Sequence, residues 1–123
     1  MGTKSSQTEP MIERFGTTRR YSDVVAHGNT IYLVEVPETL TADITTQTSE
    51  VLASIERLLT KAGSDKTRLL MVTIYLSDMR EYAAMNEVWD AWVPEGTAPV
   101  RACVEARLAN PGYRVEIVVT AAR

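Results

Sequence analysis

Arg101 is the residue of this chain best suited to bind a small organic anion. It lies in residues 100–108, where apolar and other residues alternate as they do in a β-strand. A guanidinium matches a carboxylate through two parallel charge-assisted hydrogen bonds, and a lysine would serve poorly in that role. On position alone, an ion pair with a carboxylate of a neighbouring chain is the more ordinary interpretation, so both roles stay open.

Cys103 is the only cysteine, and the alternation places it on the same face as Arg101, ~7 Å away. A nucleophilic thiol needs a base beside it, and the only histidine, His27, falls in a predicted hairpin turn. We therefore interpret the thiol as part of a pocket wall, while a small buried hydrophobe is an equally open interpretation. A single cysteine also excludes an intrachain disulfide and leaves too few thiolates for a structural zinc site.

The spacing of apolar residues indicates two helices with a strand between them. Residues 41–62 carry apolar side chains on one helix face, and Gly63 suits a left-handed cap. Residues 69–76 are almost continuously apolar or β-branched, which predicts a central strand covered on both faces. A second helix is expected at about residues 80–93. Its buried stripe is predicted to contain Tyr82, Met85, Trp89, Trp92 and Val93. We interpret the two tryptophans as core and not as a stacking platform.

The remaining strands are predicted to join the central one in a single sheet. Three short runs, residues 11–15, 21–26 and 31–36, predict an antiparallel meander. Residues 100–108 and 113–120 alternate and predict two more strands.

The last two strands are not expected to pair as a hairpin. Such pairing would set Glu105 against Glu116 and Arg107 against Arg114, and like charges directly opposite are unfavourable. The last strand can instead insert beside the meander. The expected architecture is therefore one α/β (α+β) domain, with a six-stranded mixed sheet and both helices on one face.

The second face of that sheet is expected to need cover. It is predicted to contain Cys103, Val118 and apolar residues of the meander. On a single chain these residues would form a partly solvent-exposed apolar surface that favours association. Self-association is the natural way to cover it.

Composition limits the partners. The chain has 123 residues, enough for one domain, and we expect residues 1–10 to be a disordered leader outside a domain at residues 11–123. A net charge of −3 and a pI near 5.2 provide no positive field for phosphates, so nucleic acid is not expected as a partner. Neither a membrane span nor a signal peptide is indicated, which together with the single thiol favours the cytoplasm.

A longer motif surrounds Arg101. The segment from Pro99 to Glu116 has the sequence P-V-R-A-C-V-E-A-R-L-A-N-P-G-Y-R-V-E. It resembles the C-terminal signature of the YjgF/Rid family, also called endoribonuclease L-PSP, and the resemblance extends over nearly the whole chain after the leader. The Trp-Asp-Ala-Trp run and the Asn-Pro-x-Tyr turn look most like the YoaB-like branch.

The resemblance implies a chorismate-mutase-like subunit, three of which close their sheets into a barrel with small-molecule clefts at the interfaces. Family members of the imine deaminase type hydrolyse reactive 2-imino or enamino acids to 2-oxo acids and ammonia. No metal and no organic cofactor is implied, and the expected partner is a small carboxylate-bearing substrate.

The resemblance also implies roles for individual residues. Arg101 would bind the substrate carboxylate, and Glu116 would position or activate the attacking water, although on position alone it is a solvated strand glutamate. The backbone carbonyl of Cys103 is a candidate partner for the imine nitrogen. Tyr21 and Asn86 are carried over as pocket residues.

The chain departs from the family pattern at the end of the third strand. Typical members have a small hydroxyl residue followed by glycine there, whereas this chain has Val34 and Glu35. If Glu35 faces the cleft, it would neutralise Arg101 or occupy the carboxylate site, or take an acid/base role of its own. The expected consequence is altered substrate choice or much reduced deaminase activity.

Two other functions compete with imine hydrolysis. One is a non-catalytic trimer that binds small carboxylates or acts as a chaperone-like or regulatory protein. The other is a ribonuclease or translation inhibitor, against which the acidic charge and the lack of a basic, aromatic-lined stripe both count.

Overall fold

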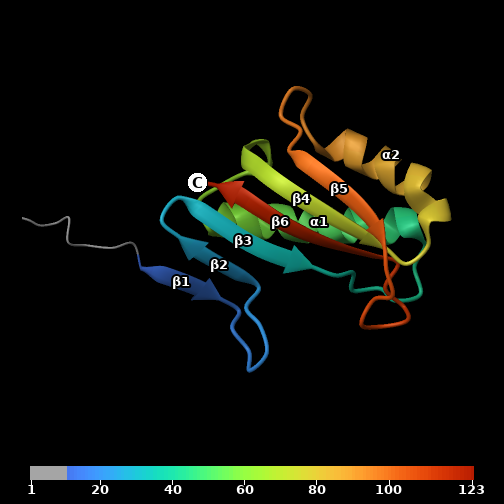
Figure 1. Ribbon diagram of the computed structural model, residues 1–123, viewed down its shortest axis with the longest axis horizontal. Coiled ribbons are helices and arrows are strands. Elements are labelled where there is room, and N and C mark those ends of the chain that lie inside the picture. Colours follow the sequence, from blue (N-terminus) through green and yellow to red (C-terminus); the bar gives the residue numbers. More distant parts are fainter. Residues whose placement is uncertain (1–10) are drawn as a thin grey trace, which may run out of the picture.

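The alternation of apolar residues along the chain produces one sheet of six strands in the computed structural model, which describes residues 11–123 (Figure 1). The expected leader, residues 1–10, lies outside the described residues. The strands are β1 (Ile12–Phe15), β2 (Val24–His27), β3 (Thr30–Glu35), β4 (Leu69–Leu76), β5 (Val100–Glu105) and β6 (Val115–Ala122). The helices are α1 (Ile44–Lys61) and α2 (Tyr82–Trp92), with the short turns η2 (Lys66–Arg68) and η3 (Met79–Glu81).

The strand order is β1-β2-β3-β6-β4-β5. Neighbouring strands are antiparallel except for β4 and β5, which run parallel and are joined through α2. Strand β6 inserts between β3 and β4 and does not pair with β5, as the repulsion between like charges predicted. Figure 1 shows α1 behind the sheet and α2 beyond the edge strand β5.

Helix α1 begins and ends where its capping residues require. The Asp43 carboxylate accepts a hydrogen bond from the Thr46 amide at 2.9 Å, which makes it the N-cap. Gly63, with a φ of 88°, takes the left-handed conformation just after the helix. The helix is therefore shorter at both ends than the predicted 41–62. Its face toward the sheet buries Val51, Ile55 and Leu59 completely.

Strand β5 ends three residues earlier than predicted. Its only neighbour is β4, which ends at Leu76, so no partner remains beyond the pairing of Leu76 with Glu105. The Ala106 amide still donates to the Leu76 carbonyl at 2.9 Å, and the chain then leaves the sheet. An edge strand lasts only as long as the strand it pairs with, which sequence alternation alone does not reveal.

The face of the sheet away from the helices, here called the open face, is rich in exposed apolar side chains. Tyr32, Met71, Val100, Val104 and Val118 are all more than a third exposed there. Because these residues come from four different strands, they form a continuous surface rather than isolated side chains. The expectation of an apolar second face is met by these residues.

Cys103 was expected on that face and lies on the other one. It pairs with Ile74, which is fully buried beneath the helices, and it packs against the same core. Strand register, and not composition, therefore decides which face of the sheet each side chain of β5 occupies. The apolar Val100 and Val104 lie on the open face, and Arg101 and Cys103 point toward α2.

Gln47 of α1 is a fully buried polar side chain that holds the loop before β6. Its amide nitrogen donates to the Gly112 carbonyl at 2.8 Å and to the Thr39 carbonyl at 3.1 Å. Its carbonyl oxygen accepts from the Arg114 amide at 2.8 Å. These bonds tie residues 106–114 to the helix, and through Arg114 they position the first residues of β6.

Gln47→Ala is expected to lower the free energy of unfolding by ~2–4 kcal/mol, because it leaves backbone groups without partners and opens a cavity. Urea denaturation would measure the change. Ser49→Ala, on the exposed side of the same helix, is the matched control and should stay within ~0.5 kcal/mol of the parent. Equal midpoints for the two variants would contradict the role given to Gln47.

Glu35, the last residue of β3, turns toward the helices and not toward the open face. It is half-buried and accepts a hydrogen bond from the Ser54 hydroxyl of α1. Burial raises the pKa of Glu35, and the nearby Asp23 and Glu38 carboxylates raise it further, while the Ser54 hydrogen bond and Arg57 oppose the shift. The folded protein therefore favours the neutral form of this carboxyl.

Glu35→Gln is expected to stabilise the protein at neutral pH. A pKa that is higher in the folded state adds stability at acid pH, and this contribution is lost as the pH rises through the folded value. The uncharged variant should melt roughly 1–3 °C higher at pH 7, and the gap should close as the pH falls below about 4. Melting curves between pH 3 and 8 measure this, with the exposed Glu87→Gln as control. A gap that widened toward acid pH would contradict the raised pKa.

Candidate functional site

Arg101 lies at the start of β5, and its side chain rests against one face of α2. Its Nη1 donates to Asn86 Oδ1 at 2.8 Å, and its Nη2 donates to the Tyr82 hydroxyl oxygen at 3.2 Å. The guanidinium carbon lies 5.3 Å from the centre of the Trp89 ring and 5.8 Å from that of Tyr82. The three contacts follow one another on the helix at spacings of four and three residues, so a single face of α2 supplies all of them.

The partners of Arg101 are all neutral. Within residues 11–123 the ion pairs involve Lys66, Arg80, Arg114 and Arg123, and none includes Arg101. Aromatic faces and an amide oxygen attract a guanidinium without cancelling its charge. The cation is therefore held in place and left able to bind an anion.

One of these contacts, Tyr82, was assigned differently from the sequence. Tyr82 was predicted to be buried, but it is 42% exposed, at the start of a helix that lies beyond the edge strand β5 (Figure 1). Trp89 is part of the core, as predicted, with 6% exposure, and its ring also makes a cation–π contact with the Arg101 guanidinium. Asn86, a polar residue in the middle of an apolar helix stripe, is the sequence signal that would have indicated that Tyr82 and Trp89 contact Arg101.

Cys103 lies two residues after Arg101 in β5 and on the same face of the sheet. Burial raises the pKa of its thiol, and the nearby Arg101 charge only partly opposes this. The thiol therefore stays protonated at neutral pH. His27, the last residue of β2, is separated from β5 by three strands and cannot act as its base. The interpretation of the thiol as a lining group fits this geometry better than a nucleophilic role.

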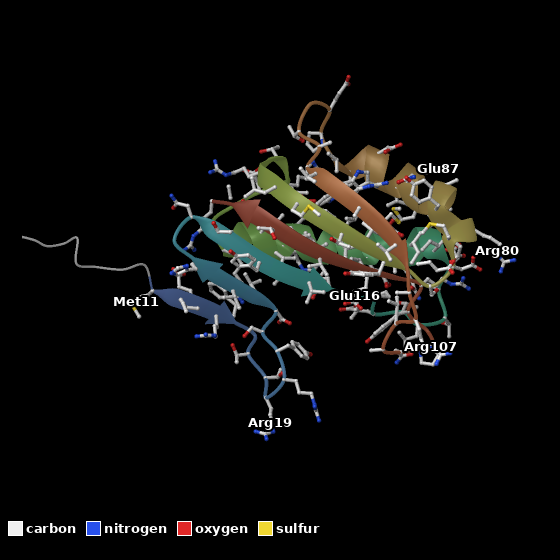
Figure 2. All side chains as sticks on the ribbon, viewed as in Figure 1. Met11, Arg19, Arg80, Glu87, Arg107 and Glu116 are labelled. Carbon is white, nitrogen blue, oxygen red and sulfur yellow. The ribbon has the colours of Figure 1, made fainter. Side chains whose placement is uncertain are left out.

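Glu116, labelled in Figure 2, projects from β6 to the open face. Its neighbours Val115 and Ile117 are fully buried under the helices, so the side chain between them points the opposite way. It stands opposite Tyr75 of β4. Arg101 and Glu116 of one chain therefore lie on opposite faces of the sheet and do not meet.

The other predicted pocket residues also lie apart from Arg101 within one chain. Tyr21 is 59% exposed in the loop between β1 and β2. Val34 faces outward on β3, beside Val118, and lines a shallow apolar cavity of about 230 Å³. Glu35 is held by Ser54 on the helix side, with β6 and β4 between its strand and β5. The expectation that it neutralises Arg101 is therefore not met within the subunit.

A larger surface cavity of about 710 Å³ lies beside the loop that follows β5. Its lining includes Glu105, Arg107 and Tyr113, at the opposite end of the strand from Arg101 (Figure 2 labels Arg107). This cavity and the residues with the clearest chemistry therefore do not coincide.

The described part of the chain offers no group of three or more His, Cys, Asp or Glu side chains arranged to hold a metal ion. None of the helices within residues 11–123 has the length and apolar character needed to cross a membrane.

Comparisons with known proteins show which family this chain belongs to. The family model described as Endoribonuclease L-PSP matches residues 11–123. The RutC family protein YoaB of Escherichia coli is 51% identical over 111 residues, covering 90% of this chain and 97% of that protein. A RutC family protein of Haemophilus ducreyi is 46% identical over 113 residues, covering 91% and 97%.

Solved structures extend the comparison to the fold. A member of the YjgF protein family from Neisseria meningitidis superposes with a TM-score of 0.91 at 51% identity, covering 94% of this chain and 98% of that one. An uncharacterized protein from Pseudomonas aeruginosa gives a TM-score of 0.89 at 46% identity, covering 92% and 99%. With the family model matching every described residue, the chain belongs to the YjgF family, whose model is described as Endoribonuclease L-PSP.

Proposed function

We propose that this protein hydrolyses reactive 2-imino or enamino acids to 2-oxo acids and ammonia, at a site centred on Arg101. The observation that carries the proposal is the guanidinium held only by Asn86, Tyr82 and Trp89, with its charge uncompensated by any carboxylate in the described residues. A site of this kind binds a small carboxylate through the donors that remain.

The reaction needs a bound imine, a water molecule and a proton carrier. Arg101 holds the carboxylate, and the Cys103 carbonyl accepts a hydrogen bond from the imine nitrogen. Glu116 takes a proton from water as the water oxygen adds to C2, and it passes that proton to the nitrogen. The proton of the new C2 hydroxyl then moves to the nitrogen in the same way, the C–N bond breaks as the C=O bond forms, and ammonia leaves the 2-oxo acid. Every atom comes from the imine and water, so no cofactor is required.

The site is completed between subunits. Arg101 and Glu116 lie on opposite faces of the sheet, so one substrate can contact both only if they come from different chains. The apolar open face provides the reason for chains to associate, and a homotrimer that closes its sheets into a barrel would cover it. Tyr21 and Val34 would then act from the neighbouring subunit, whereas Glu35 stays bound to Ser54 on the helix side of its own subunit. A reducing cytoplasm suits the unpaired thiol of Cys103.

A carboxylate-binding trimer without catalysis is the second candidate. It is favoured by the lack of a carboxylate beside Arg101 that could act as a base within the described chain. Stable binding of 2-oxobutanoate with no ammonia release from 2-iminobutanoate would establish it in place of the hydrolase. Equal rates to ordinary family enzymes would instead show that Val34 and Glu35 leave the activity intact.

Arg101→Ala is expected to lower kcat/KM for 2-iminobutanoate by roughly 100- to 1000-fold, because the carboxylate loses its charged partner. Arg101→Lys should recover only a small part of the loss, since an ammonium cannot form the paired hydrogen bonds. Ammonia release from enzymatically generated imine is the measurement. Arg107→Ala, an exposed arginine six residues further along, is the control and should keep the parent rate. Equal rates in Arg101→Ala and the parent protein would remove the hydrolase proposal.

A mixture of two inactive variants tests whether the site is shared. Arg101→Ala and Glu116→Gln chains, co-expressed in equal amounts, should regain about one quarter of the parent activity, because random assembly pairs an intact Arg101 with an intact neighbouring Glu116 at that frequency. The same variants assembled separately and mixed afterwards are the control. No recovery on co-assembly, with trimers confirmed by mass, would show that both residues act from one chain.

A further inference from the structure

The side chains around Arg101 keep several hydrogen-bond donors that the subunit itself does not use. A guanidinium has five N–H donors and no acceptor. Two of these donors are used, by Asn86 and Tyr82, which leaves three. The Asn86 oxygen accepts one of these bonds, and its NH₂ group brings two further donors to the cluster.

Tyr82 contributes the least expected of these donors. Because Arg101 can only donate, the Tyr82 oxygen must be the acceptor in the 3.2 Å contact with Nη2. The proton of the hydroxyl is therefore not used in that bond, and it has no acceptor elsewhere in residues 11–123. The side chain is 42% exposed, so a ligand at Arg101 can reach this hydroxyl.

We propose that Tyr82 is a second ligand-contacting residue, whose hydroxyl donates a hydrogen bond to the oxygen or nitrogen on C2 of the carboxylate bound at Arg101. This rests on the proposed binding of 2-imino or 2-oxo acids. It concerns a residue that the family signature around Arg101 does not include.

The geometry at Nη2 supports this position for the C2 group. The two hydrogens of Nη2 point about 120° apart, so a carboxylate oxygen on the second one would lie roughly 5 Å from the Tyr82 oxygen. An acceptor atom on C2 fits between them, within hydrogen-bond distance of the hydroxyl. The carboxylate and its C2 substituent would thus be bound by different groups.

A Tyr82 donor at this position also selects the type of C2 group. A 2-oxo acid presents an acceptor to it, whereas a 2-amino acid presents an ammonium, which has no lone pair and is repelled by the guanidinium. The site should therefore bind 2-oxobutanoate more tightly than butanoate, which lacks a C2 acceptor, and more tightly than 2-aminobutanoate.

The experiment compares these three ligands by isothermal titration calorimetry with the full-length protein and with Tyr82→Phe, which keeps the ring over the guanidinium. We expect Tyr82→Phe to weaken 2-oxobutanoate binding by roughly 3- to 10-fold, the value of one hydrogen bond, and to leave butanoate binding within about twofold. Tyr113→Phe, outside the site, is the control and should change neither affinity.

Several results would overturn the proposal. Equal losses for 2-oxobutanoate and butanoate would mean that Tyr82 only positions Arg101, and no loss for either would mean that it contacts nothing. Binding of 2-aminobutanoate as tight as that of 2-oxobutanoate would contradict a hydrogen-bond donor at the C2 position. If the parent protein binds none of the three, or binds them unchanged after Arg101→Ala, then the carboxylate site itself fails. A crystal structure of the unmodified protein with 2-oxobutanoate provides a test without the variant: the Tyr82 oxygen should lie within about 3.2 Å of the ketone oxygen.

Discussion

The pairing of β5 with β4 determines where the chemistry of this protein lies. Val72 stands beside Arg101 and Ile74 beside Cys103, and both partners are fully buried under the helices. Arg101 and Cys103 must therefore point the same way, toward α2. A shift of one residue in this register would send the guanidinium to the open face and bring Val100 into the interior. The parallel pairing depends in turn on α2, which connects the two strands.

The environment of Arg101 explains how a cation can be fixed in place and still be available. Trp89 lies beneath the guanidinium, and Asn86 accepts one of its hydrogen bonds. Packing of this kind restricts the rotamers of a long side chain before any ligand arrives, which lowers the entropic cost of binding. A carboxylate partner would have restricted it equally well, but it would have cancelled the charge that a substrate needs.

The open face has the opposite character, because its exposed side chains are mainly apolar and Glu116 stands among them. Under the proposed trimer, the surface that brings the subunits together is also the one that delivers Glu116 to a neighbouring Arg101. Assembly and catalysis would then depend on the same sheet, and loss of the apolar contacts would separate the two charged groups.

The sequence by itself determined the element types, the helix limits within a few residues and the insertion of the last strand beside the meander, and it singled out Arg101 as the candidate anion-binding residue. Apolar spacing, capping residues and the like charges of Glu105 and Glu116 can all be recognised in the sequence, so they can be interpreted without coordinates. The tertiary structure alone decided which face Cys103 occupies, how far β5 extends and which side chains surround Arg101. Those features depend on strand register and on a helix packed across it, and Tyr82 therefore became visible as a site residue only in the fold.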